Sequence, residues 1–465
     1  MSKELPENTG LTSWPIRLFL VVALCFPLLQ VKAATDRVVV LISVDGLAGF
    51  YLDDPQADIP NLRALAAGGA RSAAMLASTP TVTWPNHTTL VTGVTPARHG
   101  VVGNNYFNRS TGKRVTLIAD PVFDKDQIVK VPTIYDVAKA NGLVTAALRW
   151  PATRNAKTLD WTIPDIGSPQ LREKYSTPSL WAECERTGLS VNKAKTADGE
   201  PGFTDRMDGT FTQIFNRVLR EHRPQLALLH LLNVDHAQHL YGPRSPEAYA
   251  AIKGADHCVG LVWEELKRDF PGRAALFVVS DHGFSPIEKI ILPNVILKNE
   301  AISTQTGTKN PGDVFALAQG GSAFIYIRNE ARREALETKL RRVFADTEGV
   351  ARVIGTDQFA AYGVADPRQD PHAPDLILFA KLGYAFGNTA AGALPFQDKP
   401  ERRGTHGHDP HLPELHATFV AWGAGIKPGV QLAEISNLDV APTIASLLGV
   451  DFPADGKVLT TVLTN

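Results

Sequence analysis

The stretch RVVVLISVDG, residues 37–46, decides the fold. Five aliphatic residues follow one another from Val38 to Ile42, without the alternation of a half-exposed strand. A short run that is apolar at every position predicts a strand buried on both faces, as in a parallel sheet covered by helices. The run ends in Asp45-Gly46, so an acidic side chain stands at the carboxyl end of the strand. Ligands bind at that edge of open parallel sheets, which makes Asp45 the first candidate site residue.

The same pattern occurs twice more along the chain. Residues 226–234 are mostly apolar and end in Asp235-His236, and residues 274–280 end in Asp281-His282-Gly283. Alternation of buried strands with helices predicts an α/β fold, a three-layer α/β/α sandwich with a mostly parallel central sheet. The helices are predicted at Pro60–Ala67, Ile134–Asn141, Asp205–Glu221, Pro246–Phe270 and Ala441–Leu448, and a further core strand at Leu415–Trp422.

Residues from about 284 to 400 break this rhythm. They contain an Asn/Thr/Gly-rich loop, a short strand at Ala323–Ile327, a charged helix at Glu330–Asp346 and a Pro/Asp-rich turn at 365–375. We interpret this stretch as a smaller cap subdomain inserted into one domain that spans residues 35–465.

The N-terminus differs in composition from the rest of the chain. Arg17 precedes a short apolar run at 18–29, and small residues follow at Ala33 and Ala34. A run shorter than about 20 residues with this ending predicts a signal peptide over residues 1–34 rather than a membrane span. The mature chain is then periplasmic or secreted. An uncleaved anchor is the alternative, and Leu24 argues against lipid attachment at Cys25.

Charge and cysteine content exclude other classes. The 465 residues include 47 basic and 48 acidic side chains, a net charge of -1, and no basic patch that indicates a nucleic-acid polymer as partner. Without Cys25, the two remaining cysteines are Cys184 and Cys258. They form either a disulfide or two buried free thiols, and no CxxC motif indicates a thiolate metal site.

A polar motif, Thr83-Trp84-Pro85-Asn86-His87, precedes Gly93. Proline is favoured at the first helical position, so we expect a helix from Pro85 to Gly93 with Thr83 just ahead of it. The free N–H groups and dipole of a helix N-terminus attract anions. Thr83 is therefore either a helix cap or a nucleophile that faces a phosphate.

Carboxylates and histidines that suit a metal ion gather at the predicted sheet edge. Asp235 and His239 are four residues apart and project from one helix face. Each residue alone also fits a turn, a cap or the surface, but together they supply carboxylate and imidazole ligands for two zinc or similar divalent ions. The candidate ligands are Asp45, Asp235, His239, Asp281, His282 and His406. The other histidines, among them His87, His99, His236, His257, His408 and His411, we assign to packing, supporting or surface positions.

The order of these motifs resembles the type I phosphodiesterase/nucleotide pyrophosphatase branch of the alkaline phosphatase superfamily. The matching elements are Asp-Gly after the first strand, Thr-Trp-Pro-Asn-His, Asp-x-x-x-His, Ser-Asp-His-Gly and a late Gly-x-His-Gly, and they extend over essentially the whole mature chain. The resemblance implies an alkaline phosphatase-like fold and a secreted enzyme that hydrolyses phosphate diesters, with a small phosphate ester, nucleotides included, as substrate.

The resemblance also assigns roles residue by residue. It implies that Thr83 is the nucleophile and contacts one zinc ion held by Asp45, Asp281 and His282. A second zinc ion is held by Asp235, His239 and His406. Asn104 corresponds to the asparagine that binds a phosphate oxygen, and Trp84 to an aromatic residue that stacks on a base.

A metal site also fits the chemistry of the threonine. A threonine hydroxyl is a poor nucleophile at neutral pH, and no general base lies beside Thr83 in the motif, so a metal ion must lower its pKa. Two ions then support an in-line displacement through a phospho-threonine intermediate.

Departures from the family pattern leave alternatives open. His408 stands where members often have tyrosine, and only Trp161 and Tyr175 are candidates for a second stacking ring. A phosphomonoesterase keeps the fold and metals but usually needs a further charged group. A phosphonoacetate-type hydrolase remains open because of the residues 103–107, GNNYF. A secreted binding protein on a degenerate scaffold is the non-catalytic alternative.

Overall fold

The computed structural model describes residues 36–464 apart from 119–122, 190, 192–202 and 310. The signal peptide predicted for residues 1–34 lies outside the described residues, and so does Cys25. Residues 34–465 form one compact unit. In the described part of the chain, no helix combines the length and the apolar character that a membrane crossing requires.

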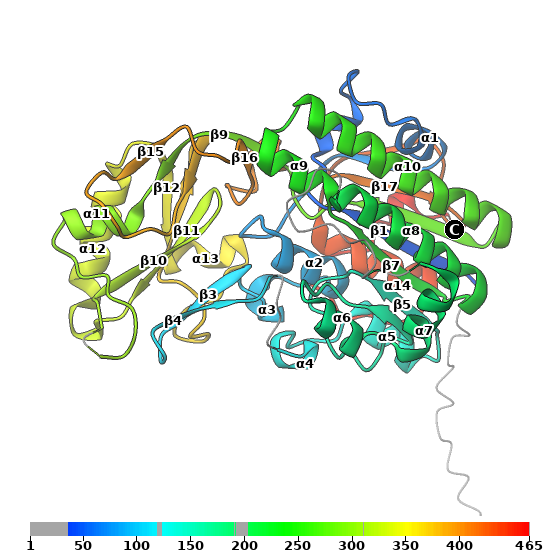
Figure 1. The fold of residues 1–465 in the computed structure, drawn as a ribbon, viewed down its shortest axis with the longest axis horizontal. Helices are drawn as coiled ribbons and strands as arrows, with labels where there is room; N and C mark the ends of the chain where they lie inside the picture. Colours follow the sequence, from blue (N-terminus) through cyan, green and yellow to red (C-terminus); the bar gives the residue numbers. More distant parts are fainter. Residues whose placement is uncertain (1–35, 119–122, 190, 192–202, 310, 465) are drawn as a thin grey trace, which may run out of the picture. The chain divides into compact units, whose positions relative to one another are not determined.

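An eight-stranded sheet forms the centre of the fold (Figure 1). Every strand runs in the same direction except β17, which is antiparallel to both of its neighbours. The three strands that end in acidic residues, β7, β1 and β8, are adjacent, which brings their carboxyl ends together. The strand order is β18 (Val430–Ser436), β2 (Ala70–Leu76), β17 (Phe419–Gly423), β8 (Ala274–Val279), β1 (Val38–Val44), β7 (Leu226–Leu231), β5 (Thr145–Leu148) and β6 (Trp161–Ile163).

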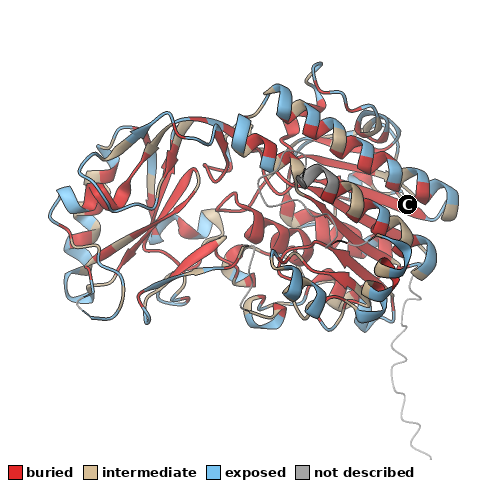
Figure 2. Ribbon diagram, in the orientation of Figure 1, coloured by how far each residue is buried: buried red, intermediate tan, exposed pale blue. Residues whose placement is uncertain are grey.

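Helices cover both faces of this sheet, and β1 shows why. Its side chains alternate between two apolar clusters, with Val40 and Ile42 in one and Val39 and Leu41 in the other. Figure 2 shows the resulting buried strands of the central sheet, with the exposed residues of the covering helices on their outer sides. The first cluster includes residues of α1 (Pro60–Gly68), α7 (Pro178–Thr187), α8 (Phe203–His222) and α10 (Pro246–Asp269), and the second those of α2 (Thr83–Thr92), α5 (Ile134–Ala140) and α14 (Val440–Leu448). The predicted three-layer α/β/α fold is therefore confirmed.

Three predicted boundaries differ from the structure. The strand predicted to reach Val234 ends at Leu231, and α9 (Asn233–Tyr241) begins soon after it. The strand predicted from Leu415 begins at Phe419, because Pro413–Leu415 form a 3-10 turn, η4. The helix predicted from Pro85 begins two residues earlier, so Thr83 is its first residue rather than the residue ahead of it.

A second region lies between β9 (Ser285–Ile291) and β16 (Gly404–Thr405). These two strands pair antiparallel, so the chain leaves the core and returns to it at adjacent positions. Between them an antiparallel sheet forms in the order β10 (Val314–Gln319), β11 (Ser322–Ile327), β13 (Leu376–Ala380) and β12 (Val350–Gly355), while β14 (Gly383–Phe386) and β15 (Phe396–Asp398) pair with β9. This architecture fits an inserted cap, whose exact limits at about 284 and 400 stay a prediction.

The two faces of the cap sheet are covered by different segments. Residues of α11 (Pro293–Asn299) and α12 (Arg333–Ala345) share an apolar cluster with one face. Phe107, in the hairpin of β3 (Asn105–Asn108) and β4 (Lys113–Thr116), packs with Phe324 and Phe379 of the other face. The sequence analysis missed this hairpin, which precedes the insertion by more than 150 residues. The shorter elements are α3 (Pro96–His99), α4 (Lys125–Ile128), α6 (Pro169–Tyr175), α13 (Thr356–Phe359), η1 (Gly49–Leu52), η2 (Glu330–Arg332), η3 (Ala360–Tyr362), η5 (Asn437–Asp439) and η6 (Thr460–Val462).

Cys184 and Cys258 are not bridged by a disulfide in this structure. Cys184 of α7 and Cys258 of α10 are both buried in the apolar layer on one face of the sheet. Burial raises the pKa of the Cys184 thiol to about 11, so this group is not an activated thiolate at neutral pH. Of the two alternatives that the sequence left open, the structure has the buried thiols.

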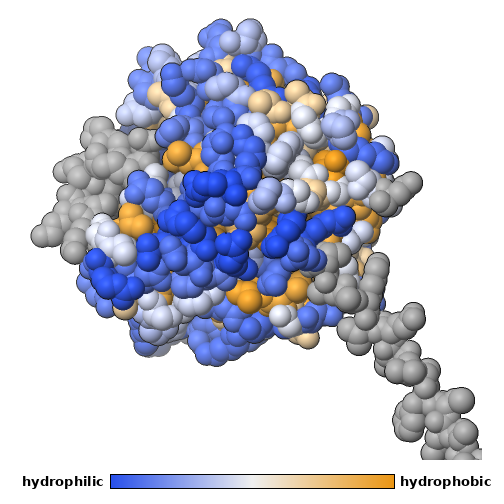
Figure 3. All heavy atoms as spheres, turned by 90° about the vertical axis from the view of Figure 1, so that its right-hand side faces the viewer, coloured by the Kyte–Doolittle hydropathy of each residue, from blue (hydrophilic) through white to orange (hydrophobic). Residues whose placement is uncertain are grey.

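Figure 3 shows that the face on the right of Figure 1 is mainly hydrophilic, with apolar residues scattered over it.

Candidate active site

The turn after β1 brings two candidate ligands together. The Asp45 N–H donates to the Leu231 carbonyl over 2.9 Å, and the Gly46 N–H donates to Oδ1 of Asp281 over 3.1 Å. Gly46 has a φ of +69°, a left-handed conformation that disfavours other residues, and an added Cβ would lie 3.1 Å from the ring of Phe284. Glycine at this position therefore lets Asp281 reach the end of β1.

Asp45, Asp281 and His282 form the first group of candidate ligands. One ligand atom from each lies within 4.8 Å of those of the other two, and all three residues are buried. Nε2 of His282 is 3.1 Å from Oδ2 of Asp281 and 3.5 Å from Oδ1 of Asp45. The structure therefore brings together the three residues that the resemblance assigns to one ion.

Asp235 is the centre of the second group. Its Oδ1 lies 3.4 Å from Nε2 of His239 and 3.5 Å from Nε2 of His406. His282 also belongs to the set of ligand atoms within 4.8 Å around Asp235 and His406, and its ring stacks on that of His406 at 3.7 Å. The two groups are thus adjacent, with His282 between them.

The three histidines among the candidate ligands have the same hydrogen-bond arrangement. Nδ1 of His282 bonds to the Gly283 carbonyl, that of His239 to Gly404 and that of His406 to Thr81, over 2.9–3.0 Å. A carbonyl accepts only, so each Nδ1 carries the proton. Burial lowers the pKa of His239 to about 3 and of His406 to about 4, so these rings are neutral and their Nε2 lone pairs face carboxylate oxygens.

Several ligand atoms at this edge have no hydrogen-bond partner although they are buried. They are Oδ1 of Asp45, Oδ1 of Asp235, Oδ2 of Asp281 and Nε2 of His282. Burial raises the pKa of Asp45 and of Asp281 well above the ordinary value, and the approach of other carboxyl groups adds to the shift. Lone pairs directed at one another in a buried space are unfavourable unless a cation lies between them. These residues therefore fit divalent metal ions by their chemistry and by their unpaired atoms.

Thr83, the first residue of α2, is connected to this cluster through His87. Its carbonyl accepts from Nδ1 of His87 over 2.9 Å, and the same Nδ1 lies 3.4 Å from Oδ2 of Asp281. Two residues earlier, the Thr81 carbonyl contacts His406. The threonine is 6% exposed, so the N-terminus of α2 is held against both ligand groups.

Asn104 contacts the first turn of the same helix. Its Oδ1 accepts from the Trp84 N–H over 2.8 Å. This donor identifies the amide oxygen, so the Nδ2 group points away from the Trp84 N–H. Asn104 therefore lies against the first turn of α2, which begins at Thr83, and its role in binding a phosphate oxygen stays a prediction.

The candidate stacking rings lie differently from the expectation. Trp84 is 1% exposed, because its indole packs among Val101, Val102 and other apolar residues. The ring has no face open to solvent in this structure, and its role in binding a base stays a prediction. Trp161 is level with Val40 in the sheet, well before the carboxyl edge, and stacks on His222 at 3.6 Å. Tyr175 packs against the guanidinium of Arg154.

Four residues near the ligands were not singled out as site residues from the sequence. His230 lies 3.1 Å from Oδ2 of Asp45, and His87 contacts Asp281 as described above. Arg149 and Asp208 form a buried ion pair behind them. A histidine within the apolar strand β7 was a usable signal for His230, whereas nothing in the spacing links Arg149 to Asp208. Of the other histidines, His99 and His408 are buried and His236, His257 and His411 are exposed.

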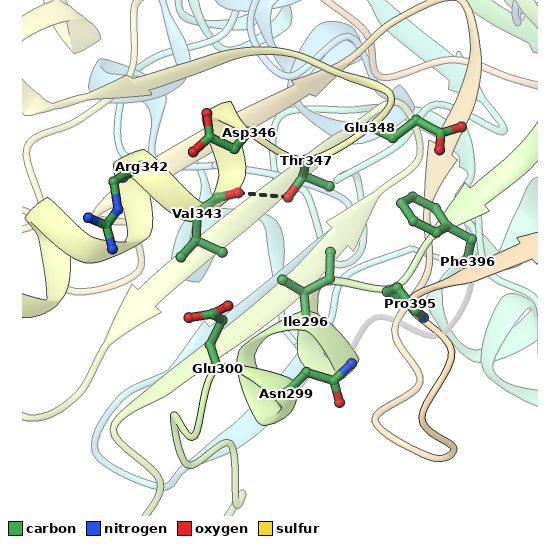
Figure 4. Close-up of a pocket in the computed structure, with 10 residues that line it drawn as sticks. All are labelled: Ile296, Asn299, Glu300, Arg342, Val343, Asp346, Thr347, Glu348, Pro395 and Phe396. Atoms are coloured by element: carbon green, nitrogen blue, oxygen red, sulfur yellow. Dashed lines mark hydrogen bonds between the residues drawn. The ribbon is translucent and has the colours of Figure 1, made fainter.

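A cavity of about 650 Å³ lies away from these ligands, on the cap (Figure 4). It is open to solvent and lies between α11, the end of α12 and the start of β15, and its lining includes Glu300, Arg342 and Phe396. None of its ten lining residues is a candidate site residue. The sheet edge, rather than this cavity, therefore carries the candidate chemistry.

Solved structures with the same fold are ectonucleotide pyrophosphatases/phosphodiesterases. The human member 5 aligns with 92% of this chain and 100% of its own at a TM-score of 0.69 and 19% identity. A murine member 5 structure, of an inactive threonine-to-alanine variant in complex with AMP, aligns over the same shares at a TM-score of 0.67 and 18% identity. The fold is therefore of the alkaline phosphatase type.

The family model described as type I phosphodiesterase/nucleotide pyrophosphatase matches residues 39–409. The chain belongs to this family, as its motifs predict, and is thereby a phosphoric diester hydrolase. Among curated relatives, it is 25% identical to an uncharacterized pyrophosphatase/phosphodiesterase of Schizosaccharomyces pombe, over 94% of this chain and 83% of that protein. It is also 25% identical to human ectonucleotide pyrophosphatase/phosphodiesterase family member 7, over 91% and 82%.

Other relatives are longer than the matched region. Human family member 1 is 23% identical over 88% of this chain but only 39% of its own length. A venom phosphodiesterase of Macrovipera lebetinus is also 23% identical, over 88% of this chain and 43% of that protein. The chain thus spans less than half the length of these two relatives, and the rest of each relative lies outside the matched region.

Proposed function

We propose that this chain hydrolyses phosphate diesters, nucleotide esters among them, through a phospho-threonine intermediate on Thr83 at a site for two zinc ions. One ion is assigned to Asp45, Asp281 and His282, and the other to Asp235, His239 and His406. The observation that carries the proposal is the set of buried, unpaired ligand atoms beside the N-terminus of the helix that begins at Thr83.

Zinc in such a site lowers the pKa of a coordinated hydroxyl and neutralises charge on a phosphate. The protein supplies the positioning. His282, His239 and His406 are each fixed by a carbonyl at Nδ1, so that only Nε2 is available as a ligand. His87, which bonds to the Thr83 carbonyl, fixes the start of α2 against Asp281.

In the first step, Oγ1 of Thr83 attacks phosphorus in line with the leaving alkoxide. The bond from phosphorus to Oγ1 forms as the bond to the leaving oxygen breaks, and the proton of Oγ1 passes to water while the alkoxide takes one up. The Nδ2 group of Asn104 donates to a nonbridging oxygen, where negative charge increases. Free N–H groups in the first turn of α2 add to this stabilisation.

In the second step, water attacks the phospho-threonine from the opposite side. The bond from phosphorus to Oγ1 breaks, Oγ1 is reprotonated and a phosphate monoester leaves. Both transfers use the same residues in reverse order, because the leaving group of the second step is the nucleophile of the first.

A substrate panel tests this proposal. Wild-type chain and Thr83→Ala are compared on bis(4-nitrophenyl) phosphate, a nucleoside 5′-(4-nitrophenyl) phosphate, 4-nitrophenyl phosphate and phosphonoacetate. We expect the wild type to prefer the diesters and the variant to lose this turnover. AMP in the complex of the murine relative supports a nucleoside ester as the better diester.

The other outcomes separate the alternatives. A preference for 4-nitrophenyl phosphate would identify a phosphomonoesterase on the same fold. Release of phosphate from phosphonoacetate would identify carbon–phosphorus cleavage. Full diester turnover by Thr83→Ala would exclude the phospho-threonine route.

We also propose that the chain acts outside the cytoplasm after removal of residues 1–34. The apolar run at 18–29 followed by Ala33 and Ala34 supports export. Mass spectrometry of the protein from a secretion-competent host tests it. A mature N-terminus near Ala34 or Thr35 is expected, and a full-length chain retained in the cytoplasm would contradict export.

A further inference from the structure

A chain of buried contacts behind the ligands begins at Arg149, directly after β5. The residue is 8% exposed and has a φ of 55°, which lies in the left-handed region that residues other than glycine rarely adopt. Its carbonyl and its guanidinium each have a fixed partner, and the two partners lead to different candidate ligands.

The Arg149 carbonyl is connected to Asp45 through His230. Nδ1 of His230 donates to the Arg149 carbonyl over 2.9 Å, and Nε2 of the same ring lies 3.1 Å from Oδ2 of Asp45. The ring of His230 therefore connects the Arg149 carbonyl to the Asp45 carboxyl group. Oδ1 of Asp45 has no hydrogen bond and remains available for an ion.

The Arg149 guanidinium is connected to the start of α9 through Asp208. Nη1 of Arg149 donates to Oδ1 of Asp208 over 2.8 Å, and this carboxylate is 3% exposed. Oδ1 of Asp208 also accepts from the Leu232 N–H over 3.0 Å, and Oδ2 from the Asn233 N–H over 2.9 Å. The first N–H groups of a helix have no acceptor within the helix, so Asp208 holds the start of α9 from outside.

The helix that Asp208 holds carries ligands of the second group. α9 begins at Asn233 and places Asp235 and His239 on one face, one turn apart. The position of the helix start therefore sets the position of both ligands. Arg149 is anchored in turn, because its guanidinium lies 4.9 Å from the centre of the Phe211 ring and its fork of donors is planar and rigid.

We propose that Arg149 is a positioning residue that holds Asp45 and the start of α9 in a fixed relation, and thereby sets the distance between the two metal sites. The inference rests on the metal sites of the proposed function. It adds a residue that touches neither ion nor substrate and that acts through His230 on one side and Asp208 on the other.

Zinc binding without substrate tests the inference. The zinc content and affinity of the full chain are measured by competition with a chromophoric chelator for wild type, Arg149→Met, Asp208→Asn and the double variant. Loss of residues that orient ligands typically lowers metal affinity about 10- to 100-fold. We expect at least a tenfold loss in each single variant for the more weakly held ion.

The double variant distinguishes positioning from simple destabilisation. Arg149→Met leaves the Asp208 carboxylate buried without its cation, and the second substitution removes that charge. We therefore expect the double variant to bind zinc no more weakly than Arg149→Met alone. Additive losses would show that the two residues act separately and would overturn the inference.

A matched control lies on the same helix as Asp208. Arg217 of α8 pairs with Glu183 of α7, away from the ligands. Arg217→Met is expected to lower the unfolding temperature while it leaves zinc affinity at the wild-type value. An equal loss of zinc in this control would assign the effect to general destabilisation.

The remaining outcomes are also decisive. If Arg149→Met does not fold, Asp208→Asn decides, because the amide keeps the size of the side chain and one acceptor oxygen, while it removes the charge and replaces the other acceptor with a donor. Folded Asp208→Asn with two zinc ions at wild-type affinity would overturn the inference. A wild-type chain that binds two ions but cleaves no diester would leave it intact and overturn the proposed function, whereas a wild-type chain that binds none would overturn both.

Discussion

Two buried carboxyl groups, one at the edge of the central sheet and one in the cap, differ in the counterions that surround them. Asp375, before β13 of the cap, accepts from the Ile327 N–H over 2.6 Å and is paired with both Arg109 and Arg333. Asp281, after β8 of the core, accepts one N–H at Oδ1, and its Oδ2 has no hydrogen bond. Both are at most 2% exposed.

The comparison teaches what each group requires. A buried carboxylate is stable only when counterions and donors surround it. Arg333 of the cap and Arg109 of the β3–β4 hairpin supply them, so the charge of Asp375 is balanced within the chain. Among the described residues, no lysine or arginine pairs with Asp281, which lies beside Asp45, so we expect an ion from outside the chain to balance its charge. The predictions below test this difference, from the largest expected effect to the smallest.

Replacement of the nucleophile has the largest expected effect. Thr83→Ala should lower diester turnover by about 10⁴-fold, because it removes the atom that attacks phosphorus. Stopped assays on bis(4-nitrophenyl) phosphate measure this loss. Thr92→Val serves as the control, since Thr92 is buried in the same helix and its hydroxyl bonds to the Thr88 carbonyl. A similar loss in both variants would indicate damage to α2 instead.

Asp281→Asn should remove an ion without damaging the fold. We expect the zinc content to fall from two ions to one, with turnover at least about 100-fold lower. The metal-free variant should be no less stable than the metal-free wild type, because burial and Asp45 raise the pKa of this carboxyl group in the empty site. Elemental analysis and urea unfolding measure both quantities. Two ions retained per chain would refute the assignment of Asp281.

Asp375→Asn should lower the stability of the fold and leave the zinc content unchanged, the reverse of what is expected for Asp281→Asn. The substitution leaves Arg109 and Arg333 without their buried counterion, which typically costs about 3–5 kcal/mol of unfolding free energy. Zinc content should stay at the wild-type value, since the residue lies in the cap. Urea unfolding followed by circular dichroism measures the loss. A change in zinc content as large as that of Asp281→Asn would erase the distinction between the two regions.

Histidines can likewise be divided into those whose ring nitrogens are satisfied within the chain and those that leave Nε2 for an ion. His99 belongs to the first kind, and its replacement has the smallest expected effect. Nδ1 of His99 accepts from the Val101 N–H and Nε2 bonds to the Thr89 hydroxyl, so both ring nitrogens are used. Burial lowers the pKa of His99 to about 3. The unfolded chain binds a proton at this residue below about pH 6.5 and the folded chain does not, so stability falls as the pH falls through this window.

The expected size is about 2 kcal/mol between pH 8 and pH 5. This part of the pH dependence should disappear in His99→Gln, as measured by urea unfolding at each pH. His257→Gln, at an exposed position, should keep the wild-type dependence. Equal pH profiles for wild type and His99→Gln would show that His99 does not contribute.

The sequence predicts the strands of the core because their chemistry is local. An apolar run that ends in Asp identifies β1, β7 and β8, and the parallel order then places Asp45, Asp235 and Asp281 at one edge. The helix Asn233–Tyr241 was foreseen only through the spacing of Asp235 and His239. Its start depends on Asp208, a residue of another helix, which no local pattern reveals.

The cap and the supporting contacts are set by long-range packing. The hairpin at 105–116 joins the cap sheet through Phe107, although the spacing of its residues gives no sign of this partner. Trp84 is likewise enclosed by residues that follow it by about 20 positions or more. Motif order is informative about ligands because the chemistry of an ion restricts the residue types. It is less informative about binding surfaces, where any apolar neighbour can cover a ring.

The stereochemical course at phosphorus tests the central claim most directly. A nucleoside 4-nitrophenyl phosphorothioate diester of one configuration is hydrolysed in ¹⁸O-enriched water, and the configuration of the product thiophosphate is determined. Attack by Thr83 followed by attack of water inverts phosphorus twice, so we predict net retention. Net inversion would show a single displacement by water and would contradict the phospho-threonine intermediate.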